Sequence, residues 1–210
     1  MPGGEMQKIM ILGAGVFAQE IADVISEIPG HETLGFVEGI DRRRCAEPIL
    51  GLPVHWVDEI GGYKDICRAV CAVGSPQRDA FISQAYAQGL RFTSVVHPMA
   101  RVSTTSVLGE GTIVGPGALI GAHTEIGRHA IVNRGSLIGH HCATGDYVTI
   151  GPGANIAGKT RIGAFSLIAM GAIVIDGLSI GARCIIAAGA VVTRDVPDGV
   201  RVGGVPARAF

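Results

Sequence analysis

An aliphatic residue returns at every sixth position between Val96 and Val192. Of the 17 positions in this series, 16 are Val, Ile or Leu, and only Thr144 is polar. The next residue is usually Gly or Ala, as at Gly139 and Ala157. An α-helix repeats at about 3.6 residues and an alternating strand at about 2, so the period of six belongs to a larger structural unit.

A β-solenoid accounts for this period. Strands of about six residues form flat walls, three walls close a coil of about 18 residues, and successive coils pair at the ordinary strand spacing of about 4.8 Å. The aliphatic residue points inward, and the Gly that follows lets the backbone turn the corner. We therefore expect residues 95–210 to form a parallel β-helix with a short C-terminal tail.

The first part of the chain has a different pattern. Apolar stretches at residues 8–12, 33–37, 53–56, 67–73 and 92–96 are typical of strands, and residues 20–28 and 77–88 have helical spacing. Alternation of strands and helices predicts a small parallel α/β sheet. We expect a Rossmann-like α/β domain at 1–94, docked on the β-helix of 95–210 because no flexible linker separates them.

Charge and cysteine content narrow the functional classes. Seventeen Lys and Arg balance 18 Asp and Glu, and no basic run occurs, which argues against a partner of nucleic acid or membrane surface. No stretch of 18 apolar residues and no signal-peptide pattern is present. The five cysteines have no metal-ligand spacing, so we expect a reduced, cytoplasmic protein.

A glycine-containing turn follows the first predicted strand. This turn directs backbone N–H groups and a helix N-terminus toward an anion, and its candidate substrate-binding residues are Gly13, Ala14, Gly15, Val16 and Phe17. Glu38, at the end of the second strand, lies where a ribose-binding acid is expected. Gly74 and Ser75, after the 67–73 strand, complete this candidate site. A turn of this kind also occurs where a helix simply packs on a strand.

The size of this domain limits the ligand. A full dinucleotide site needs two mononucleotide halves, and about 90 residues hold only one. A single nucleotide or a nucleotide-linked sugar therefore fits better than NAD.

His140 is the sharpest candidate for catalysis. It lies two residues after the inward Ile138, near an outer edge of the prism. An imidazole titrates near neutral pH and suits proton removal from an amine or hydroxyl. Gly158 follows 18 residues later, one coil away on the same edge, where its N–H can stabilise a developing oxyanion.

The other histidines carry weaker signals. His123 and His141 are 18 residues apart and should stack in successive coils, but no further ligand completes a metal set, so we expect no metal. We expect His31, His55 and His129 to be solvated surface groups.

Several motifs together resemble one branch of the hexapeptide-repeat acyltransferases. They are Gly13-Ala14-Gly15, the run from Asn133 to His140, Gly145-Asp146-Tyr147, Gly158 and the tail Gly204-Val205-Pro206-Ala207-Arg208. The branch comprises nucleotide-sugar N-acetyltransferases of the bacillosamine and perosamine pathways, with sialic-acid O-acetyltransferase relatives. The resemblance covers nearly the whole chain and implies a left-handed β-helix.

The resemblance also implies a site. It implies a homotrimer with acetyl-CoA in the groove between adjacent prisms and the nucleotide-sugar in the N-terminal domain. His140 then corresponds to the proposed general base, with Asn133 and Gly158 in the catalytic group. The acetyl-CoA contacts implied are Gly158, Ala169, Met170, Ala187 and Ala188.

The chain departs from its relatives at four places. His141 stands where a carboxylate commonly orients the catalytic His, so orientation would come from Asn133, Asp146 or a neighbouring subunit. Thr149 replaces a second His of the family. Val16 and Phe17 stand where several relatives have Gly and His, which leaves the identity of the nucleotide or sugar open.

The six-residue period is never interrupted by a long loop, so the prism offers no arm to hold the acceptor. The N-terminal domain is then the candidate for that role. We expect an acetyl-CoA-dependent N-acetyltransferase acting on a nucleotide-linked amino-deoxy sugar. The alternatives are an O-acetyltransferase of sialic acid or another sugar, and a solenoid binding protein without catalysis.

Overall fold

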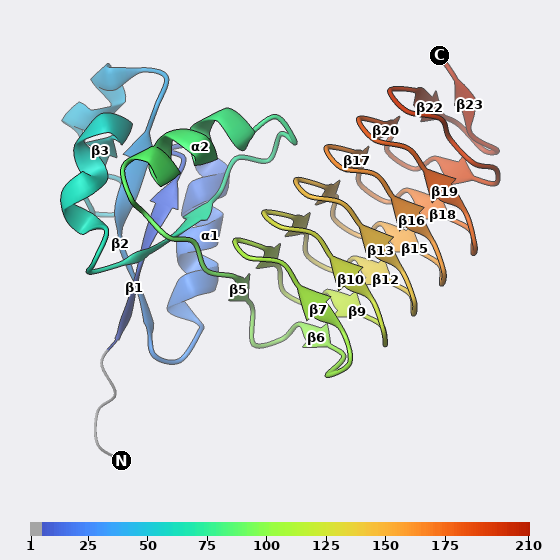
Figure 1. The fold of residues 1–210 in the computed structure, drawn as a ribbon, viewed down its shortest axis with the longest axis horizontal. Coiled ribbons are helices and arrows are strands. Elements are labelled where there is room, and N and C mark those ends of the chain that lie inside the picture. The colour runs from blue at the N-terminus through green and yellow to red at the C-terminus, as the bar shows by residue number, and fades with distance from the viewer. Residues whose placement is uncertain (1–5) are drawn as a thin grey trace.

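A computed structural model describes residues 6–210 and contains two closely packed parts (Figure 1). The first is a parallel sheet in the order β3-β2-β1-β4. Its strands are β1 (Gln7–Leu12), β2 (His31–Glu38), β3 (Val54–Trp56) and β4 (Arg68–Cys71), and its helices are α1 (Val16–Ser26), α2 (Asp79–Ala87), and the 3-10 helices η1 (Arg42–Ala46) and η2 (Val57–Tyr63). Residues 1–5 of the expected domain lie outside the described residues.

Alternation along β1 creates the two cores of this domain. Ile9 and Ile11 pack with α1, whereas Met10 and Leu12 pack with α2 and η2 on the opposite face. Both faces of a parallel sheet are thus covered, as its backbone connections require. The helix expected at 20–28 begins and ends earlier, and the strand expected at 92–96 is regular only at its last two residues, with Phe92 forming an isolated bridge.

The second part is a left-handed parallel β-helix with three walls. Wall 1 contains β5 (Val95–Val96), β8 (Ile113–Val114), β11 (Ile131–Val132), β14 (Thr149–Ile150), β17 (Leu167–Ile168), β20 (Ile185–Ile186), β22 (Arg201–Gly203) and β23 (Arg208–Ala209). Wall 2 contains β6 (Arg101–Val102), β9 (Leu119–Ile120), β12 (Leu137–Ile138), β15 (Asn155–Ile156), β18 (Ile173–Val174) and β21 (Val191–Val192). Wall 3 contains β7 (Val107–Leu108), β10 (Glu125–Ile126), β13 (Ala143–Thr144), β16 (Arg161–Ile162) and β19 (Ser179–Ile180).

The predicted period of six is confirmed by the strand register. Each strand pairs in parallel with the strand 18 residues later, as Ile138 does with Ile156. The aliphatic series is the core of the prism. The one polar member, Thr144, accepts a hydrogen bond at its Oγ1 from the N–H of Gly127 at 3.1 Å, so its hydroxyl does not lack a partner.

The α/β domain covers the outer face of wall 1. The outward residues Val95, Ile113 and Ile131 belong to the same apolar cluster as α1. At the corner between walls 1 and 2, Arg134 forms an ion pair with Glu20 of α1 at 2.9 Å. The domain therefore straddles one wall and leaves the opposite corner, between walls 2 and 3, uncovered (Figure 1).

Arg78 joins the domains at the corner between walls 3 and 1. Its side chain is 1% exposed and donates to the His129 carbonyl at 3.1 and 2.6 Å and to Thr149 Oγ1 at 2.9 Å. It also donates to the Ser75 carbonyl at 2.8 Å. Burial lowers the pKa of Arg78 to about 10, so the guanidinium stays charged at neutral pH. The 74–78 segment is thereby fixed on the prism.

Candidate functional site

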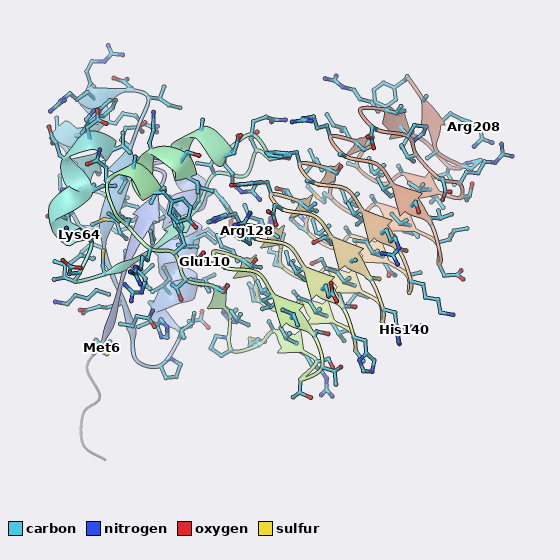
Figure 2. All side chains as sticks on the ribbon, viewed as in Figure 1. Met6, Lys64, Glu110, Arg128, His140 and Arg208 are labelled. Carbon is cyan, nitrogen blue, oxygen red and sulfur yellow. The ribbon has the colours of Figure 1, made fainter. Side chains whose placement is uncertain are left out.

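His140 lies on the corner between walls 2 and 3, directly after β12. Its side chain is exposed and points away from the lower edge of the prism, on the side opposite α2 (Figure 2). Its Nδ1 lies 3.0 Å from Nδ1 of His141. Its Nε2 has no hydrogen-bond partner within residues 6–210, so this nitrogen is the one available to a ligand.

Gly158 lies next to His140 in the following coil. A side chain at this position would place its Cβ 2.8 Å from His140 Nε2, so only glycine leaves room for the ring. The N–H of Lys159 donates to the His140 carbonyl at 2.8 Å, which fixes the two coils in register. The Gly158 N–H itself meets no acceptor in the described part of the chain. An unpaired imidazole nitrogen and an unpaired backbone N–H therefore occupy one corner, as the sequence predicted.

The remaining residues predicted to act with His140 lie on a different corner. Asn133, Ala169 and Ala187 follow β11, β17 and β20 of wall 1, and so stand at the corner between walls 1 and 2, with Met170 and Ala188 beside them. Met170 is 60% exposed. Within one chain, wall 2 separates this group from His140. Their roles stay predictions that need a second chain.

Asp146 does not contact His140. Its carboxylate accepts from the Arg128 backbone N–H at 2.7 Å and from the Arg128 guanidinium at 2.9 and 3.1 Å, on the corner between walls 3 and 1. The residue in contact with Nδ1 of His140 is instead His141, the residue that replaces the carboxylate. Rings of His123 and His141 stack across successive coils, with centroids 4.9 Å apart, as expected.

The predicted substrate turn lies on the other side of the prism, beside wall 1. Gly15 is the N-cap residue of α1, and no side chain caps the helix. Gly13 has a φ of 122°, which glycine adopts without strain, and its Cα faces the Ala72 carbonyl. Val16 is 83% exposed, whereas Ala14 is buried and Phe17 packs against the α1 cluster. The uncapped N-terminus of α1 offers free backbone donors to an anion.

Gly74 and Ser75 adjoin this turn. Because β1 and β4 are paired, the segments that follow them emerge side by side at one edge of the sheet. The Gly74 carbonyl accepts from Thr149 Oγ1 at 3.2 Å, and Ser75 Oγ donates to Gln77 at 2.6 Å. Thr149, which replaces a family histidine, therefore joins the candidate substrate loop to wall 1.

Glu38 has a structural partner set of its own. Its carboxylate is buried and accepts from the N–H groups of Gly39 and Ile40 at 2.9 and 2.8 Å. Its other oxygen pairs with Arg44 at 3.0 Å. These bonds hold the loop after β2, and the expected contact with a ribose stays a prediction.

The expectation that His129 is a solvated surface group is wrong. The side chain is 3% exposed and packs against Tyr86, Phe92 and Tyr147, with Tyr86 Oη 3.2 Å from its Nε2. Burial lowers the pKa of His129 to about 4, so the imidazole is neutral. Its repeat position was known from the sequence, but the covering of that position by α2 was not.

Arg78 is the residue that sequence reasoning missed. It lies immediately before α2, three residues after Ser75, and no motif marks it. Its five hydrogen bonds reach a carbonyl or hydroxyl on both domains, and none reaches a carboxylate. Only the folded arrangement brings these acceptors together.

Two further searches covered residues 6–210. No group of three or more His, Cys, Asp or Glu side chains is arranged to hold a metal ion there. Within the same residues, every helix is too short or too polar to span a membrane.

Comparison with known proteins follows from this geometry. The family model described as bacterial transferase hexapeptide (six repeats) matches residues 159–194. A variant of perosamine N-acetyltransferase from Caulobacter crescentus, solved with CoA and GDP-perosamine, is 32% identical over 97% of this chain and 96% of that chain, with a TM-score of 0.90. No curated protein sequence matches the chain.

Two other solved structures are similar over the same length. The acetyltransferase domain of PglB from Neisseria gonorrhoeae FA1090, solved with acetyl coenzyme A, is 28% identical over 98% of this chain and 100% of that chain, with a TM-score of 0.89. WeeI from Acinetobacter baumannii AYE is 26% identical over 98% of this chain and 100% of that chain, with a TM-score of 0.87.

Proposed function

Because this chain belongs to the hexapeptide-repeat family of sugar N-acetyltransferases, we propose that it transfers the acetyl group of acetyl-CoA to the amino group of a nucleotide-linked amino-deoxy sugar. The observation that carries the proposal is the corner where the free Nε2 of His140 lies over Gly158. Both substrate classes are bound by the similar perosamine enzyme, which was solved with CoA and GDP-perosamine.

The α/β domain holds the acceptor. The uncapped N-terminus of α1 and the turn from Gly13 to Phe17 supply donors for the phosphates. The loop at Gly74 and Ser75 lies beside them and is anchored to wall 1 through Thr149. Acetyl-CoA is bound along the prism, with its pantetheine arm past Ala169, Met170, Ala187 and Ala188.

The acceptor and the base come from different chains. The α/β domain covers wall 1, and the corner that bears His140 is the one opposite wall 1. In a triangular prism these two features face away from each other. A neighbouring copy is therefore needed to bring His140 to the sugar, and it also brings the corner of Asn133 and Ala169 toward that of His140.

Wall 2 supports a homotrimer. Its outward residues Leu119, Leu137 and Ile173 are 40%, 41% and 42% exposed and form an apolar column. The corresponding residues of wall 3 include Glu125, Arg161 and Ser179, which are polar. An exposed apolar strip on one wall favours contact with a second prism, and the cyclic arrangement of the family closes this contact at three copies.

The chemical step needs one base and one oxyanion donor. The amine nitrogen attacks the thioester carbon while Nε2 of His140 takes the proton of the amine. The Gly158 N–H stabilises the oxyanion of the tetrahedral intermediate. When the C–S bond breaks, CoA leaves as a thiolate and receives a proton, and His140 returns to its neutral form. We also place the enzyme in the cytoplasm, since all five cysteines are free.

A two-part experiment tests the function. Thermal shift with acetyl-CoA and with UDP- and GDP-linked sugars comes first, since a ligand at 100 times its Kd adds about 2.7 kcal/mol to the free energy of unfolding. Release of the CoA thiol is then followed with amino sugars of the stabilising nucleotide, and with their hydroxyl counterparts and sialic acid. Turnover with the amino sugar supports the proposal. Turnover with a hydroxyl acceptor alone, or none despite acetyl-CoA binding, overturns it.

A further inference from the structure

His141 occupies the position where relatives commonly have a carboxylate, and its ring contacts the catalytic candidate directly. The two Nδ1 atoms of His140 and His141 are 3.0 Å apart, and their ring planes are nearly perpendicular, at 87°. Asp146, which the sequence offered as an alternative, is held by Arg128 at another corner. Asn133 lies on a third corner. Within one chain, His141 is the side chain in place to orient His140.

A hydrogen bond between two Nδ1 atoms contains a single proton, and its owner decides the chemistry. If His140 donates, its proton is on Nδ1, and the lone pair of Nε2 is free to accept a proton from the amine. If His141 donates, the proton of His140 is on Nε2 and blocks the base. The bond between the two rings thus selects one of two tautomers of His140.

We propose that His141 is a positioning residue: as a neutral imidazole with its own proton on Nε2, it accepts from Nδ1–H of His140 and keeps Nε2 of His140 free. This inference rests on the proposed role of His140 as general base. During the step, His140 gains a proton on Nε2 and becomes an imidazolium, while the Nδ1 bond is unchanged. His141 supplies an acceptor without a negative charge, unlike the carboxylate that it replaces.

The arrangement makes the site sensitive to acid in a way that a carboxylate does not. Protonated His141 has a donor at both nitrogens, so His140 must then accept at Nδ1 and carry its own proton on Nε2. The titratable groups around His141 are His140, His123 in the coil before and Lys159 in the coil after. Protons bind to the two coupled rings as a pair, and the acid limb of kcat/KM reports the pair.

The first test reads the tautomer without any substrate. The imidazole ¹⁵N shifts of the labelled full-length protein are measured at pH 8, and the His140 signals are assigned by their loss in His140→Ala. The proposal expects the proton of His140 on Nδ1 and that of His141 on Nε2. A neutral His140 with its proton on Nε2 overturns it, whatever acetyltransferase activity is found.

The second test uses a matched pair of variants. His141 and His123 occupy the same corner in successive coils, both are exposed, and their φ values are 57° and 56°. Alanine therefore costs the same backbone strain at either position. We expect His141→Ala to lower kcat about tenfold or more at unchanged KM, and His123→Ala to change it less than twofold. Equal effects of the two variants overturn the positioning role.

A carboxylate at the same position gives a readout that a purely structural role does not move. His141→Glu restores an acceptor for Nδ1–H of His140 and adds a negative charge, which favours the imidazolium. The acid limb of kcat/KM should therefore move to higher pH, with kcat well above that of His141→Ala. An unmoved limb, or a kcat no better than that of His141→Ala, contradicts the proposal. Loss of activity in His140→Ala is the separate test of the general base.

Discussion

Two corners of the prism use the same backbone turn for different purposes. At the corner between walls 3 and 1, the Arg128 N–H is bonded by Asp146, and His129 is buried under Tyr86 and Phe92. At the corner between walls 2 and 3, the equivalent N–H of Gly158 has no acceptor within residues 6–210, and His140 is exposed. What differs is the cover: the α/β domain docks on one corner and leaves the other free to bind substrate.

The largest expected effect is at the uncovered corner. His140→Ala removes the general base, and we expect kcat/KM to fall by about 10²–10⁴ with the denaturation midpoint nearly unchanged, because the side chain is exposed. CoA release and urea unfolding measure the two quantities. His31→Ala, on the α/β domain, is the control. Activity within a few-fold of the wild type would break the assignment of this corner to catalysis.

The covered corner should respond in stability. Arg78→Met leaves the carbonyls of Ser75 and His129 and the hydroxyl of Thr149 without their buried donor, which costs about 2–4 kcal/mol of unfolding free energy. Urea unfolding compares this variant with Arg91→Met, where the side chain is exposed and little change is expected. Equal midpoints for the two variants would contradict the role of Arg78 in docking the domains.

The smallest effect is a pH dependence that only the buried histidine should contribute. The pKa of His129 is about 4 when folded and near 6.5 when unfolded, so the unfolded chain binds the extra proton between these values. Stability is therefore lost as pH falls through this window, by about 1.4 kcal/mol per pH unit. Unfolding free energies at pH 7 and 5 measure it, and His129→Asn should have a shallower slope than the wild type.

Asparagine is chosen because it tolerates the φ of 53° at this position. His31→Asn is the matched variant of a histidine that is not fully buried, and it should keep the wild-type slope. A slope for His129→Asn as steep as that of the wild type would show that His129 titrates in the folded protein as it does in the unfolded chain.

The repeat made much of this structure predictable, and the contacts between its two parts were not. An uninterrupted period of six gives the coil register, so the contact of His140 with Gly158 and the stack of His123 on His141 followed from counting 18 residues. The period also places Asn133 in the column of Ala169. The burial of His129 and the bonds of Arg78 depend on where the α/β domain docks, and no periodicity carries that information.

The central claim is that the acceptor site and the base belong to different chains. Gly15→Asp tests the acceptor side, because Asp is a good N-cap residue that keeps α1 while its charge repels a phosphate. Gly15→Ser is the neutral control. Gly15→Asp and His140→Ala, each inactive alone, are then co-expressed with different tags, and the mixed trimers are assayed for CoA release.

Each productive site in the mixture needs the α/β domain of a His140→Ala chain and the His140 of a Gly15→Asp chain. Random assembly of the two variants in equal amounts then restores about a quarter of the wild-type sites in a cyclic oligomer. Recovery near that level is the result the account predicts. No recovery in trimers that contain both variants would place the acceptor and the base on one chain and contradict it.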